Sequence, residues 1–258
     1  SSTDSAALEM EVGDLLSKLR VVKSEEELHV LELGGTIAKL GANAFLDAIG
    51  ENVTELTVAA HAVAEMNKAM GALYPAGGTS TYAYCQIAEH AYTPHLHPTG
   101  KRLQAGDVVA LNVFPVISGY CMELERTFIF GHPTTEQQKA LEAVNEAQDA
   151  AIAAYRPGAR MSDIDRLTRD MLTAKGYGDC LRHGTGHAHG IMIGAASREE
   201  LAELRIYNEN VLAPNMITSI EPGVFADCGT FRHSDVFICT EDGARWLTEF
   251  PRDIAYGA

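Results

Sequence analysis

Apolar side chains early in the chain recur at helical spacing. Ser24 followed by Glu27 forms a capping box, in which each side chain bonds the backbone of the other at a helix start. The apolar stripe that runs from Leu28 to Phe45 then predicts a long helix. The same spacing over residues 54–70, beginning at a threonine, predicts a second helix.

The pattern becomes strand-like after the second predicted helix. Residues 74–97 are rich in glycine and aromatic side chains, which is typical of strands joined by tight turns. Residues 107–116 form an apolar run that is expected of a buried strand. Residues 119–130 alternate between apolar and polar side chains and are expected to pair with that strand across a turn.

The same succession of elements then repeats. Thr135 is expected to cap a long helix that reaches about Tyr155. Ser162 and Asp165 are expected to cap another helix, which reaches Lys175. Strand patterns resume in three later segments, 215–224, 236–240 and 246–250.

Two helices followed by strands, twice over, predict two α+β halves around a shared sheet. No linker-like stretch separates the halves, so we expect a single domain over residues 12–258. The small and polar residues 1–11 are expected to be a flexible lead-in.

The composition is that of a folded globular protein, since 46% of the 258 residues are hydrophobic and 21% are charged. The formal net charge of −15 argues against nucleic acid and anionic membranes as partners, because both attract basic surfaces. No apolar run approaches the roughly 18 residues that a membrane-spanning helix needs. The five cysteines show no CxxC spacing, which indicates reduced thiols in a cytoplasmic protein.

Five polar blocks carry the candidate chemistry. They are Gly106–Asn112 (GDVVALN), Gly119–Phe128 (GYCMELERTF), His183–Gly190 (HGTGHAHG), Ser219–Gly223 (SIEPG) and Phe231–Asp235 (FRHSD). In order and spacing, these blocks resemble the pita-bread superfamily (family M24) of methionine aminopeptidase, prolidase, aminopeptidase P and creatinase. The resemblance implies a pita-bread fold, with two pseudo-symmetric α+β halves around a curved antiparallel sheet, and a homodimer. Creatinase and prolidase place a separate domain before the part that matches residues 12–23, and we expect that domain to be absent here. A fragment, a processed form and a truncated relative stay open as explanations.

The resemblance bears directly on metal binding. Metal-dependent members of the superfamily hold two divalent ions on two aspartates, one histidine and two glutamates. The matching positions here are, in that order, Asn112, Glu123, His187, Glu221 and Ser234. An amide and a hydroxyl bring no negative charge to a pair of dications, so we expect no paired-metal site and no cofactor. A single weakly bound ion on Glu123, His187 and Glu221 stays open as an alternative.

The chain also resembles the metal-free branch of the superfamily, which creatinase represents. The resemblance rests on Leu111–Pro115 (LNVFP) and Leu124–Thr127 (LERT). It implies that His95 is the acid–base histidine, although the nearby His97 is an alternative. It further implies that Glu125 and Glu221 grip a guanidinium-like cation. Four other residues are expected to line the substrate site: Arg198, His187, Phe114 and Cys121.

Elementary chemistry agrees with these roles. Two carboxylates can hold a planar cation through paired hydrogen bonds. An imidazole can take a proton from water and return it to a departing nitrogen. We therefore expect a metal-independent, creatinase-like hydrolase that cleaves a non-peptide C–N bond, such as an amidino bond, in a small zwitterionic substrate similar to an amino acid. For Glu125, the simpler alternative is a salt bridge with its neighbour Arg126.

Three other functions remain open on the sequence alone. The first is a metal-dependent Xaa-Pro aminopeptidase or dipeptidase, for which added metal ions would restore activity on Xaa-Pro peptides. The second is a catalytically inactive pita-bread binding module, which would have no need of His95, Glu125 and Glu221 together. The third is a lyase acting on a small zwitterion, because proton transfer by the same histidine also serves elimination.

Overall fold

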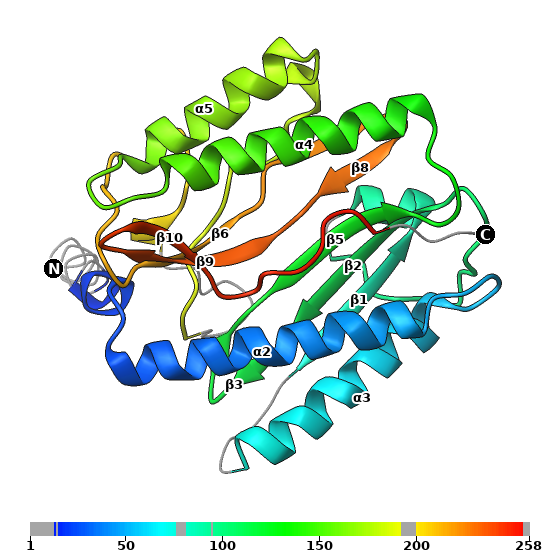
Figure 1. The fold of residues 1–258 in the computed structure, drawn as a ribbon, viewed down its shortest axis with the longest axis horizontal. Coiled ribbons are helices and arrows are strands. Elements are labelled where there is room, and N and C mark those ends of the chain that lie inside the picture. Colours follow the sequence, from blue (N-terminus) through cyan, green and yellow to red (C-terminus); the bar gives the residue numbers. More distant parts are fainter. Residues whose placement is uncertain (1–12, 14, 76–80, 94, 192–199, 255–258) are drawn as a thin grey trace, which may run out of the picture.

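The computed structural model describes residues 13, 15–75, 81–93, 95–191 and 200–254, which fold into helices around antiparallel strands. Helices α2 and α3 run along one side of the strands, and α4 and α5 run along the other (Figure 1). The helices are α2 (Glu25–Asp47), α3 (Glu55–Leu73), α4 (Thr135–Ala154) and α5 (Met161–Ala174), with 3-10 turns η1 (Ala88–Tyr92), η2 (Gly178–Cys180) and η3 (Glu200–Ala202). This arrangement confirms the α+β class and the repeated order of helices and strands.

The strands form two three-stranded antiparallel sheets and two short ribbons. One sheet has the order β1–β2–β5 and the other the order β10–β9–β6, while β3 pairs with β4 and β7 pairs with β8. The strands are β1 (Tyr82–Ile87), β2 (Val108–Phe114), β3 (Val116–Ile117), β4 (Tyr120–Cys121), β5 (Leu124–Ile129), β6 (Ile217–Ile220), β7 (Gly223–Ala226), β8 (Gly229–Arg232), β9 (Asp235–Thr240) and β10 (Gly243–Trp246).

A backbone bridge joins the two three-stranded sheets. The Glu125 amide donates to the Ser234 carbonyl at 3.0 Å, and the Ser234 amide donates back to Glu125 at 3.0 Å. Asn112 is the register partner of both Glu125 and Tyr84, so these four residues form one row across the seam. Directly opposed residues in antiparallel strands face the same side of the sheet. The row therefore brings polar side chains from both sheets together on one face of the seam.

A buried arginine holds this seam together. The Arg126 side chain has no exposed surface, and its Nη1 donates to the carbonyls of Glu125 (2.7 Å) and Ser234 (3.1 Å). Its Nη2 donates to Asp235 Oδ1 at 2.7 Å and to the Phe250 carbonyl at 2.6 Å. Arg126 thus pairs with Asp235, and it contacts Glu125 through that residue's backbone.

Each sheet is covered by its own pair of helices and has its own apolar core. Helices α2 and α3 pack on the first sheet through buried residues that include Ile37, Phe45, Met66, Leu111 and Phe128. Helices α4 and α5 pack on the second sheet through buried residues that include Ala151, Tyr155, Met161, Ile220 and Phe237. Burying this apolar surface is the main favourable term that holds helix to sheet.

Two helix starts match the sequence pattern and two differ from it. The capping box of Ser24 with Glu27 is present, and Thr54 caps α3. The cap of α4 is Thr134, one residue before the predicted Thr135, and it forms a capping box with Gln137.

The predicted capping box of α5 is wrong. The helix begins at Met161 after Arg160, so Ser162 and Asp165 lie inside it. Asp165 is buried and accepts bonds from the Thr185 amide (2.7 Å) and from Arg169 Nε (2.9 Å). Its carboxylate therefore anchors a neighbouring segment and does not cap the helix.

Two strand predictions also need correction. Among the described residues of the segment 74–97, only Tyr82–Ile87 form a strand, and a 3-10 turn follows it. The last strand ends at Trp246, so it shares a single residue with the predicted segment 246–250. Beyond Trp246, the Thr248 hydroxyl accepts a bond from the Val236 amide at 2.8 Å. The Leu247 amide also donates to the Val236 carbonyl at 2.8 Å, so one backbone bond and one side-chain bond continue the contact with β9.

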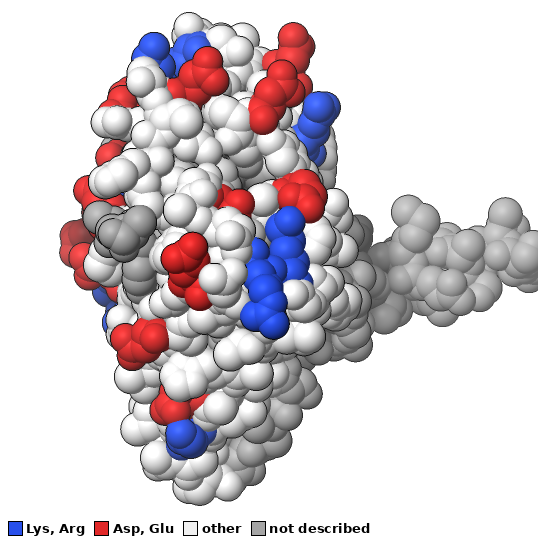
Figure 2. Space-filling view, turned by 90° about the vertical axis from the view of Figure 1, so that its right-hand side faces the viewer, with Lys and Arg blue, Asp and Glu red and all other residues white. Residues whose placement is uncertain are grey.

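No helix in the described part of the chain is long and apolar enough to cross a membrane. Figure 2 shows one face of the molecule, on which acidic side chains are scattered and basic side chains lie among them.

Candidate functional site

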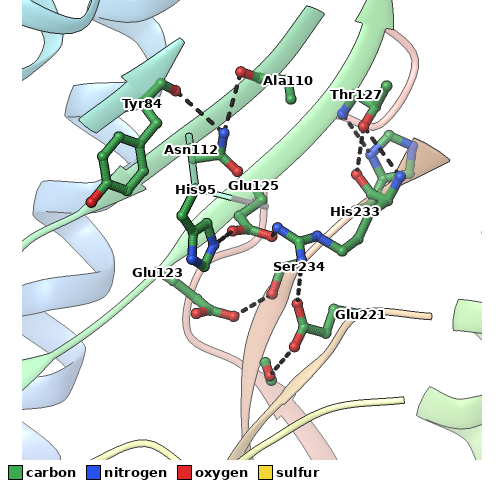
Figure 3. Close-up of polar contacts among 12 residues, drawn as sticks. Tyr84, His95, Ala110, Asn112, Glu123, Glu125, Thr127, Glu221, His233 and Ser234 are labelled. Atoms are coloured by element: carbon green, nitrogen blue, oxygen red, sulfur yellow. Dashed lines mark hydrogen bonds and ion pairs between the residues drawn. The ribbon is translucent and has the colours of Figure 1, made fainter. Parts of the chain in front are cut away.

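The candidate site lies at the seam between the two sheets (Figure 3). Its side chains come from the ends of strands and the turns beside them. Glu123 precedes β5, Glu125 lies in β5, Glu221 follows β6, and Ser234 lies between β8 and β9. All four residues are buried.

Two histidines of the block His183–Gly190 lie side by side on an extended segment along β6. The His187 carbonyl accepts from the Ser219 amide at 2.8 Å, and the His189 amide donates to the Ile217 carbonyl at 3.0 Å. Alternate residues of an extended chain share a face, and the two imidazole centroids lie 4.9 Å apart. Gly186 permits this close approach, because a Cβ there would lie 2.0 Å from the Ser219 carbonyl oxygen.

Both imidazoles face the carboxylate of Glu123. Glu123 Oε2 lies 3.4 Å from His187 Nε2, and Glu123 Oε1 lies 3.6 Å from His189 Nε2. The Ser234 hydroxyl donates to Oε1 at 2.5 Å. Burial favours a higher pKa for Glu123, but the neighbouring imidazoles outweigh it and hold that pKa well below the ordinary value. The carboxylate is therefore ionised at neutral pH.

The other nitrogen of each ring fixes the tautomer. His187 Nδ1 lies 3.1 Å from the Ala188 carbonyl oxygen, and His189 Nδ1 lies 3.2 Å from the Cys121 carbonyl oxygen. A carbonyl can only accept, so each Nδ1 carries a proton and each Nε2 faces Glu123. His189 is only 4% exposed, and its Nε2 has no hydrogen-bond partner among the described residues.

These three donors fit one divalent ion. Glu123, His187 and His189 bring ligand atoms within 4.8 Å of one another. Two imidazoles and a carboxylate are ligands that zinc and related transition metals favour. A metal-bound histidine also usually gives its other N–H to a carbonyl, as both rings do here.

A second ion does not fit the remaining positions of the superfamily's ligand set. The Asn112 amide nitrogen donates to the Tyr84 carbonyl (3.3 Å) and to Gln86 Oε1 (3.2 Å), so this side chain is tied to β1. The Ser234 hydroxyl donates to Glu123. Neither residue supplies a negative oxygen to a dication.

A guanidinium from the chain itself lies between Glu125 and Glu221. Arg232 Nη2 forms an ion pair with Glu125 Oε2, and Nη1 lies 3.6 Å from Glu221 Oε2. Burial opposes the charge on Arg232, but Glu125 and Glu221 outweigh it and raise the pKa of the guanidinium. Burial likewise favours a higher pKa for Glu221, but Arg232 leads the effects that lower it below its ordinary value. The two glutamates that were expected to grip a substrate cation therefore already hold Arg232.

His95 approaches Glu125 from the opposite side. Its Nε2 lies 3.0 Å from Glu125 Oε1, and the side chain is 39% exposed. His95 has φ of 59°, a left-handed conformation that is uncommon outside glycine. The His95 ring lies 5.7 Å from Tyr84 and 5.2 Å from Phe114. The alternative, His97, packs edge-on against Tyr84 at 5.3 Å.

Of the other predicted site residues, the structure describes Phe114 and Cys121. Phe114 is buried beside His95 and stacks on Tyr82 at 4.8 Å. The Cys121 carbonyl receives the His189 bond, while burial, followed by the nearby Glu123 charge, raises the pKa of its thiol to about 12. Arg198 lies outside the described residues. The roles of all these residues in substrate binding stay predictions.

Two residues of the site, His189 and Arg232, were not singled out from the sequence. Each lies two residues from a position that was assigned, His187 in one block and Ser234 in the other. Residues two apart share a face in an extended segment. The strand period, applied within each block, was the signal that could have found them.

Fold and site together define an α+β domain with a carboxylate–histidine cluster at the seam between its sheets. The chain belongs to metallopeptidase family M24, whose family model matches residues 31–241.

Individual relatives show which proteins of the family resemble this chain. The chain is 31% identical over 244 residues to the Xaa-Pro dipeptidase of Pyrococcus furiosus, covering 94% of this chain and 67% of the relative. It is 30% identical over 248 residues to the creatinase of Bacillus sp. (strain B-0618), covering 94% of this chain and 60% of the relative. In structure it matches the prolidase of Pyrococcus horikoshii OT3 with a TM-score of 0.85 and 27% identity, covering 95% of this chain and 68% of that one. The pita-bread fold is thereby confirmed.

The expectation of a metal-independent, creatinase-like hydrolase acting on a non-peptide C–N bond is wrong. Xaa-Pro dipeptidases, among them a second from Pyrococcus horikoshii, stand beside creatinase among the relatives, within a family of metallopeptidases. Glu123, His187 and His189 also supply a donor set for a metal ion. His189 is not one of the superfamily's ligand positions, so the charges at those positions alone did not predict its contact with Glu123.

Proposed function

We propose that this domain is a metal-dependent hydrolase of dipeptides with a C-terminal proline, in the manner of its Xaa-Pro dipeptidase relatives. The observation that carries the proposal is the convergence of two imidazole Nε2 atoms on the ionised carboxylate of Glu123, in an M24 fold. The activity of these Xaa-Pro dipeptidase relatives supplies the substrate class.

A divalent ion held by Glu123, His187 and His189 would polarise the carbonyl of the scissile peptide bond. Glu221 lies beside this cluster, with Oε1 3.5 Å from His187 Nε2. Because its pKa is lowered, Glu221 is ionised at neutral pH and can accept a proton from the attacking water.

His95 is placed to handle the second proton transfer. Glu125 Oε1 accepts from His95 Nε2, which fixes the ring and leaves Nδ1 as the other acid–base atom. A partly exposed imidazole held in this way can give a proton to the departing proline nitrogen. Glu125 acts here as the group that orients the histidine.

An aromatic wall next to His95 suits the ring of a proline. Tyr84 and Phe114 pack against the His95 imidazole, and Tyr82 stacks on Phe114. A pyrrolidine ring is apolar and flat enough to lie against such a surface, which would place its nitrogen near His95.

The test is proline release from Ala-Pro and Leu-Pro by protein that has been stripped with a chelator and then reloaded with zinc, manganese or cobalt. We expect release only after reloading, with Ala-Gly cleaved more slowly and creatine yielding no sarcosine. Failure to release proline with any of the three ions would overturn the proposal. A domain extent of 12–258, a homodimer and a cytoplasmic location stay predictions beside it.

A further inference from the structure

The segment that carries His95 follows β1 and contains two residues in an uncommon backbone conformation. Its described residues, 88–93 and 95–99, are called the histidine loop below. Ala88 and His95 have φ of 51° and 59°, in the left-handed region that side chains other than glycine rarely adopt. Such conformations persist only where the surrounding contacts hold them in place. The position of His95 therefore depends on the side chains that fasten this loop.

A buried glutamate fastens the two ends of the histidine loop. Glu55, the first residue of α3, has no exposed surface. Its carboxylate accepts from the Ile87 amide at 2.9 Å, just before the loop, and from the Thr99 amide at 2.9 Å, at the end of the loop. His90 Nδ1 lies 2.9 Å from the same carboxylate. These contacts fix where the loop begins and ends, and they do not reach His95.

A buried amide holds the middle of the histidine loop. Gln86, which lies in β1, is only 2% exposed. Its Nε2 donates to the His90 carbonyl at 2.9 Å and to the Thr93 carbonyl at 2.5 Å. The Thr93 carbonyl also accepts from the Leu96 amide at 3.3 Å, so the bonds to this one oxygen span the turn that contains His95. Both N–H groups of the Gln86 side chain are thereby used on the loop.

A second buried amide sets the orientation of the first. Asn112 Nδ2 donates to Gln86 Oε1 at 3.2 Å, and Asn112 is also only 2% exposed. The reverse orientation of Gln86 would place its oxygen against two carbonyl oxygens and its nitrogen against the Asn112 nitrogen, so no bond would form. An ionised carboxylate at position 112 could only accept, and it would favour that reverse orientation. The amide of Asn112 is therefore matched to the bonds that Gln86 makes with the loop.

We propose that Gln86 and Asn112, the amide pair, are positioning residues for His95. Asn112 orients Gln86, Gln86 holds the loop, and the loop keeps His95 Nε2 3.0 Å from Glu125 Oε1 (Figure 3). Asn112 is also the register partner of Glu125 in the neighbouring strand. The amide pair thus acts on both partners of the His95–Glu125 contact. The effect on turnover rests on the function proposed above, whereas the effect on the loop does not.

Hydrogen exchange tests the amide pair without turnover. Gln86→Met keeps the length of the side chain and removes both donors. We expect the backbone amides of residues 95–99 to exchange at least about 10-fold faster, because two carbonyls lose a buried donor, while the amides of α2 keep their wild-type rates. Gln138→Met, at an exposed glutamine on α4, is the matched control and should leave the loop unchanged. Wild-type exchange of the loop in Gln86→Met would overturn the proposal.

A pair of variants tests whether Asn112 acts through Gln86. Asn112→Leu removes the donor to Gln86 with little change of volume, and we expect about 5-fold faster exchange of the same amides, which corresponds to one neutral hydrogen bond. The double variant should exchange no faster than Gln86→Met alone, since residues that act in series are not additive. Multiplied effects would show two independent roles and contradict the proposal. Should Gln86→Met fail to fold, wild-type loop exchange in Asn112→Leu contradicts it equally.

Kinetics separate the positioning of His95 from a general structural role. We expect Gln86→Met to lower kcat for Ala-Pro by at least about 10-fold with little change in KM, because a displacement of about 1 Å can cost up to about 100-fold in rate. In a His95→Asn background, the same substitution should leave kcat unchanged, because the residue it positions is gone. An equal loss in both backgrounds would show that Gln86 acts on another group and would overturn its role toward His95.

The two kinds of measurement also distinguish this proposal from the proposed dipeptidase. Faster loop exchange in Gln86→Met, in a protein that releases no proline, supports the amide pair and removes the dipeptidase. Unchanged loop exchange, in a protein that does release proline, does the reverse.

Discussion

The two sides of the seam differ in which groups face their buried carboxylates. On the histidine side (Glu123, His187 and His189), a buried carboxylate faces the Nε2 atoms of two imidazole rings. On the arginine side (Glu125, Glu221 and Arg232), two buried carboxylates face a guanidinium. The first side offers a donor set for a metal ion, whereas the second holds a cation of the chain itself.

The difference shows that uncharged side chains at two of the superfamily's ligand positions do not leave the carboxylates of the site without a counter-charge. A buried carboxylate without a counterion is costly, because its charge has been removed from water. Arg232 satisfies this requirement beside Asn112 and Ser234, which have no charge to offer. Counting only the ligand positions of the family therefore misjudges which charges the site contains.

The largest expected effect tests the histidine side. Glu123→Gln keeps the shape of the side chain but removes the negative charge that a dication requires. We expect kcat/KM for Ala-Pro to fall by on the order of 10³-fold or more, since metal-ion stabilisation of a transition state supplies several kcal/mol. Bound metal should fall with it. Glu65→Gln, at an exposed salt bridge on α3, is the matched control and should retain both. Full activity in Glu123→Gln would show that the histidine side is not the metal centre.

The second test concerns Arg126, the fully buried arginine of the seam. Arg126→Met breaks the buried pair with Asp235 and the bonds to both sheets. We expect the free energy of unfolding to fall by about 3–5 kcal/mol, the usual consequence of leaving one buried charge unpaired. Urea denaturation measures the loss, and the number of bound ions should stay the same. A variant that unfolds like the wild type would remove Arg126 as the residue that fastens the sheets.

A smaller effect is expected where the arginine side meets the solvent. His95→Asn should lower kcat by about 10²-fold or more while KM and metal content change little, because acid–base catalysis contributes at that scale. His97→Gln is the matched control, since His97 contacts Tyr84 and should alter kcat only slightly. Equal losses in the two variants would mean that the loop, and not the His95–Glu125 contact, is what matters.

The smallest expected effect concerns pH and a histidine behind the arginine side. Burial, followed by the charges of Arg126 and Arg252, holds the pKa of His233 well below its ordinary value of 6.5. The unfolded chain therefore binds a proton there while the folded chain does not. The stability that neutral His233 contributes is fully present above pH 6.5 and is lost as the pH falls below it.

We expect the free energy of unfolding to fall by up to about 1.4 kcal/mol per pH unit below 6.5 for this group. Urea denaturation at pH 7.0 and 5.5 measures the slope, which His233→Gln should flatten. His132→Gln should leave it unchanged. An identical slope in the wild type and in His233→Gln would assign the pH dependence to other groups.

Local signals in the sequence were sufficient for much of the fold. The capping box at Ser24 and the cap at Thr54 depend on contacts within one helical turn, and both are present. The predicted cap at Ser162 failed because Asp165 has a partner, Thr185, that is 20 residues away. Capping rules cannot anticipate a competitor that only the tertiary fold brings near.

For the site as well, the sequence located residues but not the contacts between them. The five blocks located Glu123, Glu125, His187 and Glu221, and the fold brings these residues together. The pairings between blocks were not predictable, because Arg232 reaches Glu125 from a different sheet. Whether Glu125 pairs with a substrate cation or with a cation of the chain itself depends on that contact.

A guanidinium between two carboxylates has a consequence for how the protein meets its surroundings. A metal ion exchanges with the medium, and scarcity or a competing chelator removes it. Arg232 is synthesised with the chain and stays attached to it, so this share of the counter-charge never depends on supply. The ion pairs of Arg232 with Glu125 and Glu221 are therefore kept when metal is scarce.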